Sequence, residues 1–211
     1  VTPANLAPVV ANPVGPQPGT YGAPFNLQVP ANTFSDPDSN PLTYTANGMP
    51  PGITFNAGTT NFSGTPTQVG LFPVQLIASD NGSPNLKATN TFNITIGQAA
   101  VTITSGIVAN NKVYDGGTSA TISSNSVVLN GVLVADAANA VLSTNGYTAT
   151  FASAAVGTGK PVTVGGLSLS GSAPGNFLLT QPAGLTANIT GKSVTITSGI
   201  VANNKVYDGG T

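Results

Sequence analysis

The sequence predicts an all-β protein made of two tandem β-sandwich-like domains. Short runs of apolar residues alternate with polar ones, and 26 glycines and 17 prolines among 211 residues supply frequent turns between the runs. An eighteen-residue stretch, VTITSGIVANNKVYDGGT, occurs twice without a change, at Val101–Thr118 and Val194–Thr211. This spacing of 93 residues indicates a tandem array. We therefore expect one domain at residues 1–98, an unlike domain at 99–193, and the truncated start of a further copy at 194–211.

The composition excludes several classes of protein. Five lysines and six aspartates are the only charged side chains, and the net charge is −1. So weakly charged a surface neutralises neither a nucleic-acid backbone nor anionic lipid headgroups, so we expect no nucleic-acid binding and no direct membrane insertion. The chain also lacks the histidine, glutamate and cysteine from which hydrolytic triads are assembled. We therefore expect that it is not an enzyme.

Alternation predicts five strands in the first domain. Their apolar positions are, in order, Phe25, Leu27 and Val29; Leu42, Tyr44 and Ala46; Ile53 and Phe55; Phe72, Val74, Leu76 and Ala78; and Phe92, Ile94 and Ile96. Clusters of Pro, Gly and Asn between these runs favour turns. Pro73 falls on the polar face of the fourth run and has no amide hydrogen to donate, so we expect that run to be an edge strand.

The second domain is predicted to contain seven strands. They run over Val101–Ile107, Lys112–Tyr114, Ser119–Ile122, Tyr147–Phe151, Val162–Leu169, Phe177–Thr180 and Leu185–Ile189. Asn130-Gly131 lies between two apolar runs and predicts a two-residue hairpin turn. Val134–Leu142 is the only place for a short turn of helix, and Asp136, alone among alanines there, is expected to be solvated.

Motifs in both halves resemble families of large bacterial surface proteins. In the first half these are Asn5–Pro8, Phe34–Tyr44, Pro51–Phe55, Phe62–Pro66 and Ala78–Gly82. Over about residues 5–97 their order resembles cadherin-like and immunoglobulin-like surface repeats, which implies an extracellular β-sandwich. In the second half, Asn111–Thr118 contains Tyr114-Asp115-Gly116 and is followed downstream by Leu167–Gly171 and Gly175–Phe177. This half resembles the YDG-type repeat of secreted adhesins, which implies a spacer and no catalysis.

Asn5, Asp36, Asp38 and Asp80 are the candidate ligands of a calcium ion. Asp36 and Asp38 are two apart on an extended segment, so both carboxylates point to the same side, and oxygen ligands suit calcium. The cadherin-like pattern gathers the matching positions at one end of the sandwich. The alternative is that the aspartates form turns. The linker Gly97–Ala100 carries no acidic residue, so calcium is not expected to rigidify the junction between the two domains.

Lys112 and Asn176 are candidates for an internal amide cross-link, with Asp115 as the nearby acid. Domains of surface fibres use bonds between lysine and asparagine to resist pulling, and both residues lie in the YDG-like motifs. The alternative is a solvated lysine and a turn asparagine before Phe177. Each cross-link would expel one ammonia.

We expect a structural role, as stalk or spacer modules of a large secreted or surface-attached bacterial adhesin. The partners would be neighbouring modules of the same chain and a host or biofilm surface ligand. Two alternatives stay open: a carbohydrate- or protein-binding module, in which Tyr21, Tyr44 and Tyr147 would form a sugar-binding face, and an accessory domain of a secreted enzyme. The second copy, Val194–Thr211, should be frayed or loosely docked, because the strands that it would pair with are absent.

Overall fold

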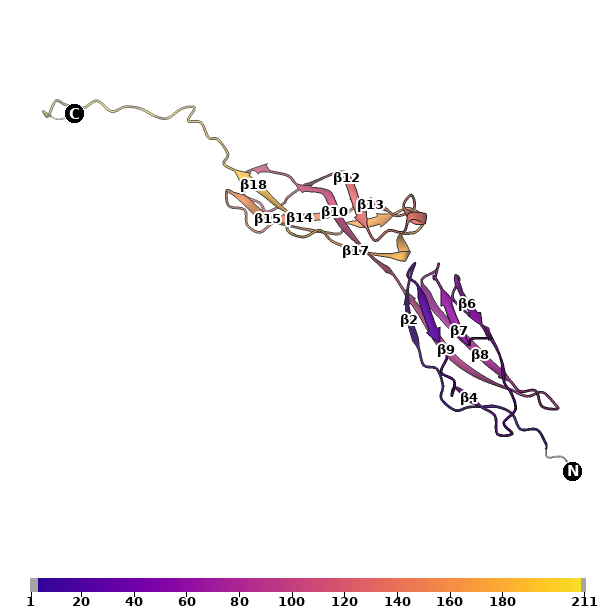
Figure 1. Cartoon of the computed structure of the whole chain (residues 1–211). Coiled ribbons are helices and arrows are strands. Elements are labelled where there is room, and N and C mark those ends of the chain that lie inside the picture. The colour runs from indigo at the N-terminus through magenta and orange to yellow at the C-terminus, as the bar shows by residue number, and fades with distance from the viewer. Residues whose placement is uncertain (1–3, 210–211) are drawn as a thin grey trace.

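The computed structural model describes residues 4–209, and its regular elements there are β-strands apart from two 3-10 helices of three residues each. The predicted all-β class is therefore confirmed. Figure 1 shows two bodies arranged end to end, with the N-terminus at one end of the molecule and an extended C-terminal segment at the other. In the described part of the chain, none of the helices has the length and apolar character needed to cross a bilayer.

The first domain is a sandwich of a four-stranded and a three-stranded sheet. Its strands are β1 (Val9–Val10), β2 (Gln17–Thr20), β3 (Phe25–Gln28), β4 (Phe34–Ser35), β5 (Thr43–Asn47), β6 (Ile53–Asn56), β7 (Asn61–Gly64), β8 (Gly70–Ser79) and β9 (Lys87–Gly97). One sheet has the order β2-β9-β8-β5, the other β3-β7-β6, and β1 pairs with β4. All of these pairs are antiparallel except β2 with β9, which is parallel.

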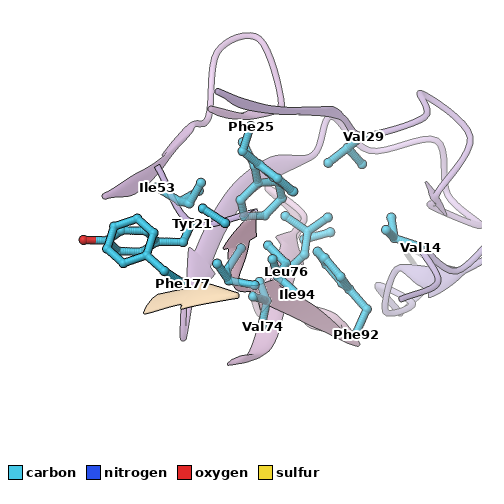
Figure 2. Close-up of a cluster of buried hydrophobic side chains, with 14 of the residues drawn as sticks. Val14, Tyr21, Phe25, Val29, Ile53, Val74, Leu76, Phe92, Ile94 and Phe177 are labelled. Carbon is cyan, nitrogen blue, oxygen red and sulfur yellow. The ribbon is translucent and has the colours of Figure 1, made fainter. Parts of the chain in front are cut away.

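The core of the first domain lies between these two sheets, as the alternating pattern requires. Phe62 of β7, Leu76 of β8 and Ile94 of β9 have no exposed surface. Phe62 lies edge-on to Phe92, with ring centroids 5.8 Å apart. Figure 2 shows how the side chains of the two sheets converge in this cluster. The apolar residues that the sequence assigned to one face of each strand therefore meet across the sandwich.

The prediction that the strand with Pro73 lies at a sheet edge is wrong. β8 is central, because it pairs with β9 on one side and with β5 on the other. The last residue of β5, Asn47, pairs with Gln75, so β5 ends before it reaches Pro73. A proline is tolerated there because no strand on that side requires its missing amide hydrogen.

The second domain contains two larger sheets and a short two-stranded one. Its elements are β10 (Ala99–Ala109), β11 (Lys112–Val113), β12 (Ile122–Asn130), η1 (Val134–Asp136), β13 (Val141–Ser143), β14 (Thr148–Phe151), β15 (Gly157–Gly165), β16 (Ser168–Ser170), η2 (Pro174–Asn176), β17 (Phe177–Thr180) and β18 (Thr186–Thr190). The sheet orders are β12-β10-β17, β11-β18-β15-β14 and β13-β16. Phe151, Val162 and Ile189 lie at the centre of its own hydrophobic core.

The hairpin predicted at Asn130-Gly131 does not form. β12 ends at Asn130, and the residues beyond Gly131 lead into the 3-10 helix η1 rather than into a strand. The partner of β12 is instead β10, which pairs with it from Thr102 opposite Asn130 to Ala109 opposite Ile122. The local turn signal was overridden by pairing with the duplicated stretch, whose first half belongs to β10. The expected turn of helix within 134–142 is present as η1.

The second copy of the duplicated stretch lies outside both domains. Every described residue from 191 to 209 is exposed, and none of them belongs to a strand. Its apolar side chains include Val194, which is 89% exposed, and Tyr207, which is 92% exposed. An ion pair of 2.8 Å joins Lys205 to Asp208, as Lys112 pairs with Asp115 in the first copy. The turn around YDG therefore forms locally, whereas the strand before it needs a partner.

Candidate functional site

The junction between the two domains is the most elaborate site in the described part of the chain. Only Gln98 separates the last strand of the first domain, β9, from the first strand of the second, β10. The side-chain amide of Gln98 donates hydrogen bonds to the carbonyl oxygens of Gly175 and Phe177, at 2.9 and 3.1 Å. The linker is therefore short and is itself bonded to the second domain.

Both the ring and the hydroxyl of Tyr21, a residue of the first domain, contact the second domain. Tyr21 follows β2 directly and is 8% exposed. Its ring lies edge-on to Phe177 of β17, with centroids 5.6 Å apart and an angle of 87° between the planes. Its hydroxyl donates a hydrogen bond of 2.7 Å to the Oδ2 atom of Asp136 in η1. Figure 2 shows this ring beside Phe177, with the hydroxyl pointing away from the core of the first domain.

Gly22 allows the second domain to approach the Tyr21 turn closely. A Cβ atom placed on Gly22 would lie 2.3 Å from a methyl carbon of Leu133, and the residue has a φ of +69°. Both the contact and the backbone conformation favour glycine. Leu133, Ala140 and Phe177 of the second domain belong to one continuous hydrophobic cluster with the core of the first domain. The two cores are thus joined across the junction.

The environment of Tyr21 keeps its phenol protonated. The hydrogen bond to Asp136 raises the pKa of the Tyr21 phenol, and burial and the negative charge of Asp136 raise it further. A tyrosinate would place a second negative charge beside the carboxylate and would lose the donated proton. The contact is therefore intact at neutral pH and depends on the protonated phenol.

Sequence reasoning missed this junction. Asp136 was expected to be solvated, but it is half-buried and accepts the Tyr21 hydroxyl. The two residues are 115 positions apart in the chain, so no local motif could pair them. The absence of acidic residues in Gly97–Ala100 concerns calcium alone, and the expectation that calcium does not rigidify the junction stays a prediction. That absence gave no indication of the aromatic contact at the junction.

The candidate calcium ligands do gather at the other end of the first domain. The Asn5 side-chain amide donates to Asp80 Oδ2 at 2.9 Å, and the Asn40 amide donates to Asn5 Oδ1 at 2.8 Å. Asp38 Oδ2 accepts the amide of Leu6 at 2.7 Å. The sequence therefore placed Asn5, Asp36, Asp38 and Asp80 in one region.

The oxygens of this cluster are largely taken up by the protein itself. Asp36 Oδ1 accepts the amides of Asp38 and Asn40, and Asp80 Oδ1 accepts those of Gly82 and Leu86. The Oδ2 atom of Asp36 is buried and has no hydrogen-bond partner among the described residues. Most of the carboxylate oxygens here already accept hydrogen bonds from the protein, whereas calcium takes six to eight oxygen ligands. The described residues also contain no group of three or more acidic, histidine or cysteine side chains arranged to share a metal.

These hydrogen bonds lower the pKa of Asp80. The largest cause is the Leu86 amide, and the Asn5 side chain and the Gly82 amide act in the same direction, against burial. Asp80 is only 2% exposed. Its carboxylate therefore fixes the turn before β9 and connects it to the N-terminal segment, which is the turn-forming role that the sequence left open.

Two families match the chain, one for each domain. Residues 7–97 match the family described as "Putative Ig domain", and residues 97–184 match the YDG domain family. The chain is an Ig-type domain followed by a YDG domain. This order confirms the two resemblances drawn from the sequence. None of the curated proteins compared with the chain matches it.

Several solved structures show distant similarity to the chain. The human desmocollin-1 ectodomain is 13% identical with a TM-score of 0.42, over 89% of this chain and 42% of its own. Drosophila N-cadherin EC1-4 is 12% identical with a TM-score of 0.43, over 90% and 50%. A nucleoside hydrolase-related protein of Saccharophagus degradans is 25% identical with a TM-score of 0.36, over 44% of this chain and 26% of its own. The chain therefore spans half or less of each of these structures.

Within the YDG domain, the structure does not bring Lys112 and Asn176 together. The Lys112 ammonium lies 2.8 Å from Asp115 Oδ1 and 2.8 Å from the carbonyl oxygen of Gly117. Lys112 pairs with Ile189 in β18, at the end of the domain where the chain leaves, whereas Asn176 precedes β17 at the Ig-type domain. The expected amide cross-link is therefore wrong for this fold, because the two residues lie at opposite ends of the domain. The Lys112 ammonium and the Gly117 amide instead lower the pKa of Asp115.

The tyrosines proposed for a sugar-binding face are used elsewhere. Tyr21 is buried in the junction, the Tyr44 ring packs 6.0 Å from Phe34, and Tyr147 packs against the YDG core. A cavity of about 560 Å³ does open beside β12, but serine, threonine, alanine, valine and leucine side chains line it. The lining contains no aromatic ring on which a sugar could stack. The geometry therefore does not support a sugar-binding face that joins the three tyrosines, although Tyr147 lines a separate hollow of about 580 Å³ with serine and threonine residues.

Proposed function

We propose that the chain is a rigid spacer in a surface-attached or secreted bacterial adhesin. The order of an Ig-type domain and a YDG domain is that of a surface- or adhesion-type module. The observation that carries the finer proposal is the junction, where Tyr21, Asp136 and Phe177 join the two domains end to end. A spacer has to keep its length, and a bonded junction restricts bending between domains.

The strand path also supports a spacer. β9 and β10 contain 11 residues each and follow one another with Gln98 between them. At about 3.3 Å per residue, they cover up to about 75 Å of path along both domains. In Figure 1 the chain enters the Ig-type domain at one end of the molecule and leaves the YDG domain at the other. Pulling on the two ends would therefore load the strand ladders along their length.

This role assigns the chain to the outside of the cell and gives it neighbouring modules as its constant partners. The scarcity of charged residues, 5% of the chain, leaves the surface with few groups that attract or repel neighbours. A host or biofilm ligand would then be bound by another part of the protein. We also propose that the chain carries out no catalysis, because its aspartates are used in turns, ion pairs and the junction.

Small-angle X-ray scattering on residues 1–193 tests the spacer role. A rigid end-to-end pair should give a maximum dimension above about 75 Å, the length of the two strand paths. The scattering should also fit a single arrangement. A compact particle with the two domains side by side, or a broad mixture of arrangements, would contradict the proposal.

A further inference from the structure

Tyr114 of the YDG motif has the same place in its domain that Tyr21 has in the Ig-type domain. In the first domain, Thr20 pairs in parallel with Gly97 of the last strand, and the Tyr21 amide donates to the Gly97 carbonyl at 2.9 Å. In the second domain, Val113 pairs in parallel with Thr190 of the last strand, and the Tyr114 amide donates to the Thr190 carbonyl at 2.8 Å. Each tyrosine therefore directly follows a strand, beside the point where the chain leaves its domain.

The spacing along the sequence agrees with this equivalence. Tyr114 follows Tyr21 by 93 residues, which is also the spacing from Val101 to Val194. The same spacing relates Gly97 to Thr190, the carbonyl partners of the two tyrosines. Each tyrosine thus lies at the same chain distance from the first strand of the domain that would follow. The Ig-type domain keeps this register although it shares none of the eighteen-residue stretch.

The two tyrosines differ in what covers them. Tyr21 is 8% exposed and its ring contacts Phe177 of the YDG domain, whereas Tyr114 is 43% exposed and has no following domain beside it. The Tyr114 hydroxyl makes no hydrogen bond to any described residue, whereas that of Tyr21 donates to Asp136. The residue after each tyrosine differs: Gly22 directly follows Tyr21, whereas Asp115 follows Tyr114 and the turn glycine, Gly116, comes one residue later. A Cβ atom on Gly22 would meet Leu133, and one on Gly116, at a φ of +82°, would meet nothing within 4 Å.

The YDG domain contributes three groups that face the Tyr21 turn. The Asp136 carboxylate and the Phe177 ring contact Tyr21, and Leu133 lies against Gly22. A second YDG domain with this sequence would present the same groups at the end that faces the N-terminus. Val194–Thr211 begins such a copy without a change in its eighteen residues.

We propose that Tyr114 is the docking residue for a following YDG domain. Its ring would lie against the phenylalanine equivalent to Phe177, and its hydroxyl would donate to the carboxylate equivalent to Asp136. This inference rests on the proposed spacer function, because it requires YDG domains in series. It assigns to the tyrosine of the YDG motif the task of joining one repeat to the next.

The linker between two YDG domains differs from the first linker in a way that increases the importance of Tyr114. Gly191 replaces Gln98, so the two side-chain hydrogen bonds to the carbonyls of Gly175 and Phe177 have no equivalent. Lys192 replaces Ala99, which is buried in the first junction. The tyrosine would therefore make a larger share of the contacts between domains at the second junction than Tyr21 makes at the first.

The test uses the full chain extended after Thr211 by a copy of residues 119–190. Because Val194–Thr211 is identical to Val101–Thr118, this extension completes a second YDG domain. The chain has no cysteine, so spin labels can be attached to cysteines placed at the exposed Thr163 and at its counterpart in the added domain. Pulsed electron paramagnetic resonance then measures the distance distribution across the second junction, before and after Tyr114→Ala.

We expect a narrow distribution in the extended chain and the loss of that narrow peak in Tyr114→Ala. In the chain that ends at Thr211, the same substitution should leave the melting temperature nearly unchanged, since no following domain packs on Tyr114 there and 43% of its surface is already exposed. A narrow distribution that persists in Tyr114→Ala overturns the docking role while the spacer function stands. A broad distribution in the unsubstituted extended chain contradicts rigid YDG arrays and therefore the proposed function itself. A lower melting temperature of Tyr114→Ala in the shorter chain would show a role within its own domain and would also overturn the inference.

Discussion

The contact between Tyr21 and Asp136 should account for a measurable part of the stability of the junction. Tyr21→Phe removes one hydrogen bond of 2.7 Å to a half-buried carboxylate and keeps the ring against Phe177. Water can still reach Asp136, so we expect a loss of about 1 kcal/mol rather than the larger cost of a fully buried charge. Tyr21→Ala also removes the buried ring, and the loss should rise to about 3 kcal/mol.

A double-mutant cycle isolates this hydrogen bond from the other effects of each substitution. Tyr21→Phe, Asp136→Ala and the double variant are compared by equilibrium urea unfolding of the full chain, followed by circular dichroism. If the two side chains interact as the geometry indicates, the coupling free energy should be about 1 kcal/mol. Tyr44→Phe is the matched control, because its ring packs on Phe34 and its hydroxyl has no hydrogen-bond partner among the described residues. A coupling between Tyr21 and Asp136 no larger than that between Tyr44 and Asp136 would refute the reasoning.

Three further predictions concern the Tyr21 phenol, the Asp80 carboxylate and the response of the acidic cluster to calcium. The pKa of the Tyr21 phenol is raised in the folded protein, so its contribution to stability is complete below its pKa in the unfolded chain, about 10, and is lost as pH rises through its pKa in the folded protein. Above pH 10, the urea midpoint should therefore fall less steeply with pH in Tyr21→Phe than in the unsubstituted chain. The lowered pKa of Asp80 has the opposite sign, so its contribution is present above the unfolded pKa of about 3.9 and is lost as pH falls through the folded value. Acid unfolding monitored by circular dichroism should therefore be less pH-dependent in Asp80→Asn, and an unchanged acid transition would contradict this role. Backbone and side-chain amides already donate to most of the carboxylate oxygens of Asp36 and Asp80. Calcium at ten times a typical extracellular dissociation constant should therefore not raise the melting temperature. A stabilisation of about 1.4 kcal/mol that Asp36→Ala abolishes would establish a calcium site.

The fold class could be predicted from the sequence because the pattern that determines it lies within each short segment of the chain. Alternation of Val74, Leu76 and Ala78 with polar residues determines which face of β8 is buried, and these three side chains have no exposed surface in the structure. Pairing between distant strands is not local. The Asn130-Gly131 signal predicted a hairpin, but β12 pairs with β10, whose residues lie more than a dozen positions earlier. The central position of β8 likewise depends on β5 and β9 together.

The geometry of the candidate sites also depends on residues that are distant in the sequence, so it could be predicted only in part. The acidic motif placed Asn5, Asp36, Asp38 and Asp80 in one region, but which oxygens are free depends on the directions of backbone amides such as that of Leu86. The junction was missed because Tyr21 and Asp136 meet only when both domains are folded and docked. One signal was present in the sequence: Tyr21 and Tyr114 are separated by the period of the duplicated stretch. A search for single residues that keep the repeat period would have found it.

The central claim is that the junction is rigid through its aromatic and hydrogen-bonded contact and needs no metal ion. It is tested most directly by pulsed electron paramagnetic resonance between labels at Thr89 on β9 and Thr163 on β15, both exposed, in the presence of a calcium chelator and then of millimolar calcium. The account predicts one narrow distance distribution that is the same in both conditions and that broadens in Tyr21→Ala. A broad distribution in the chelator that narrows when calcium is added would contradict it.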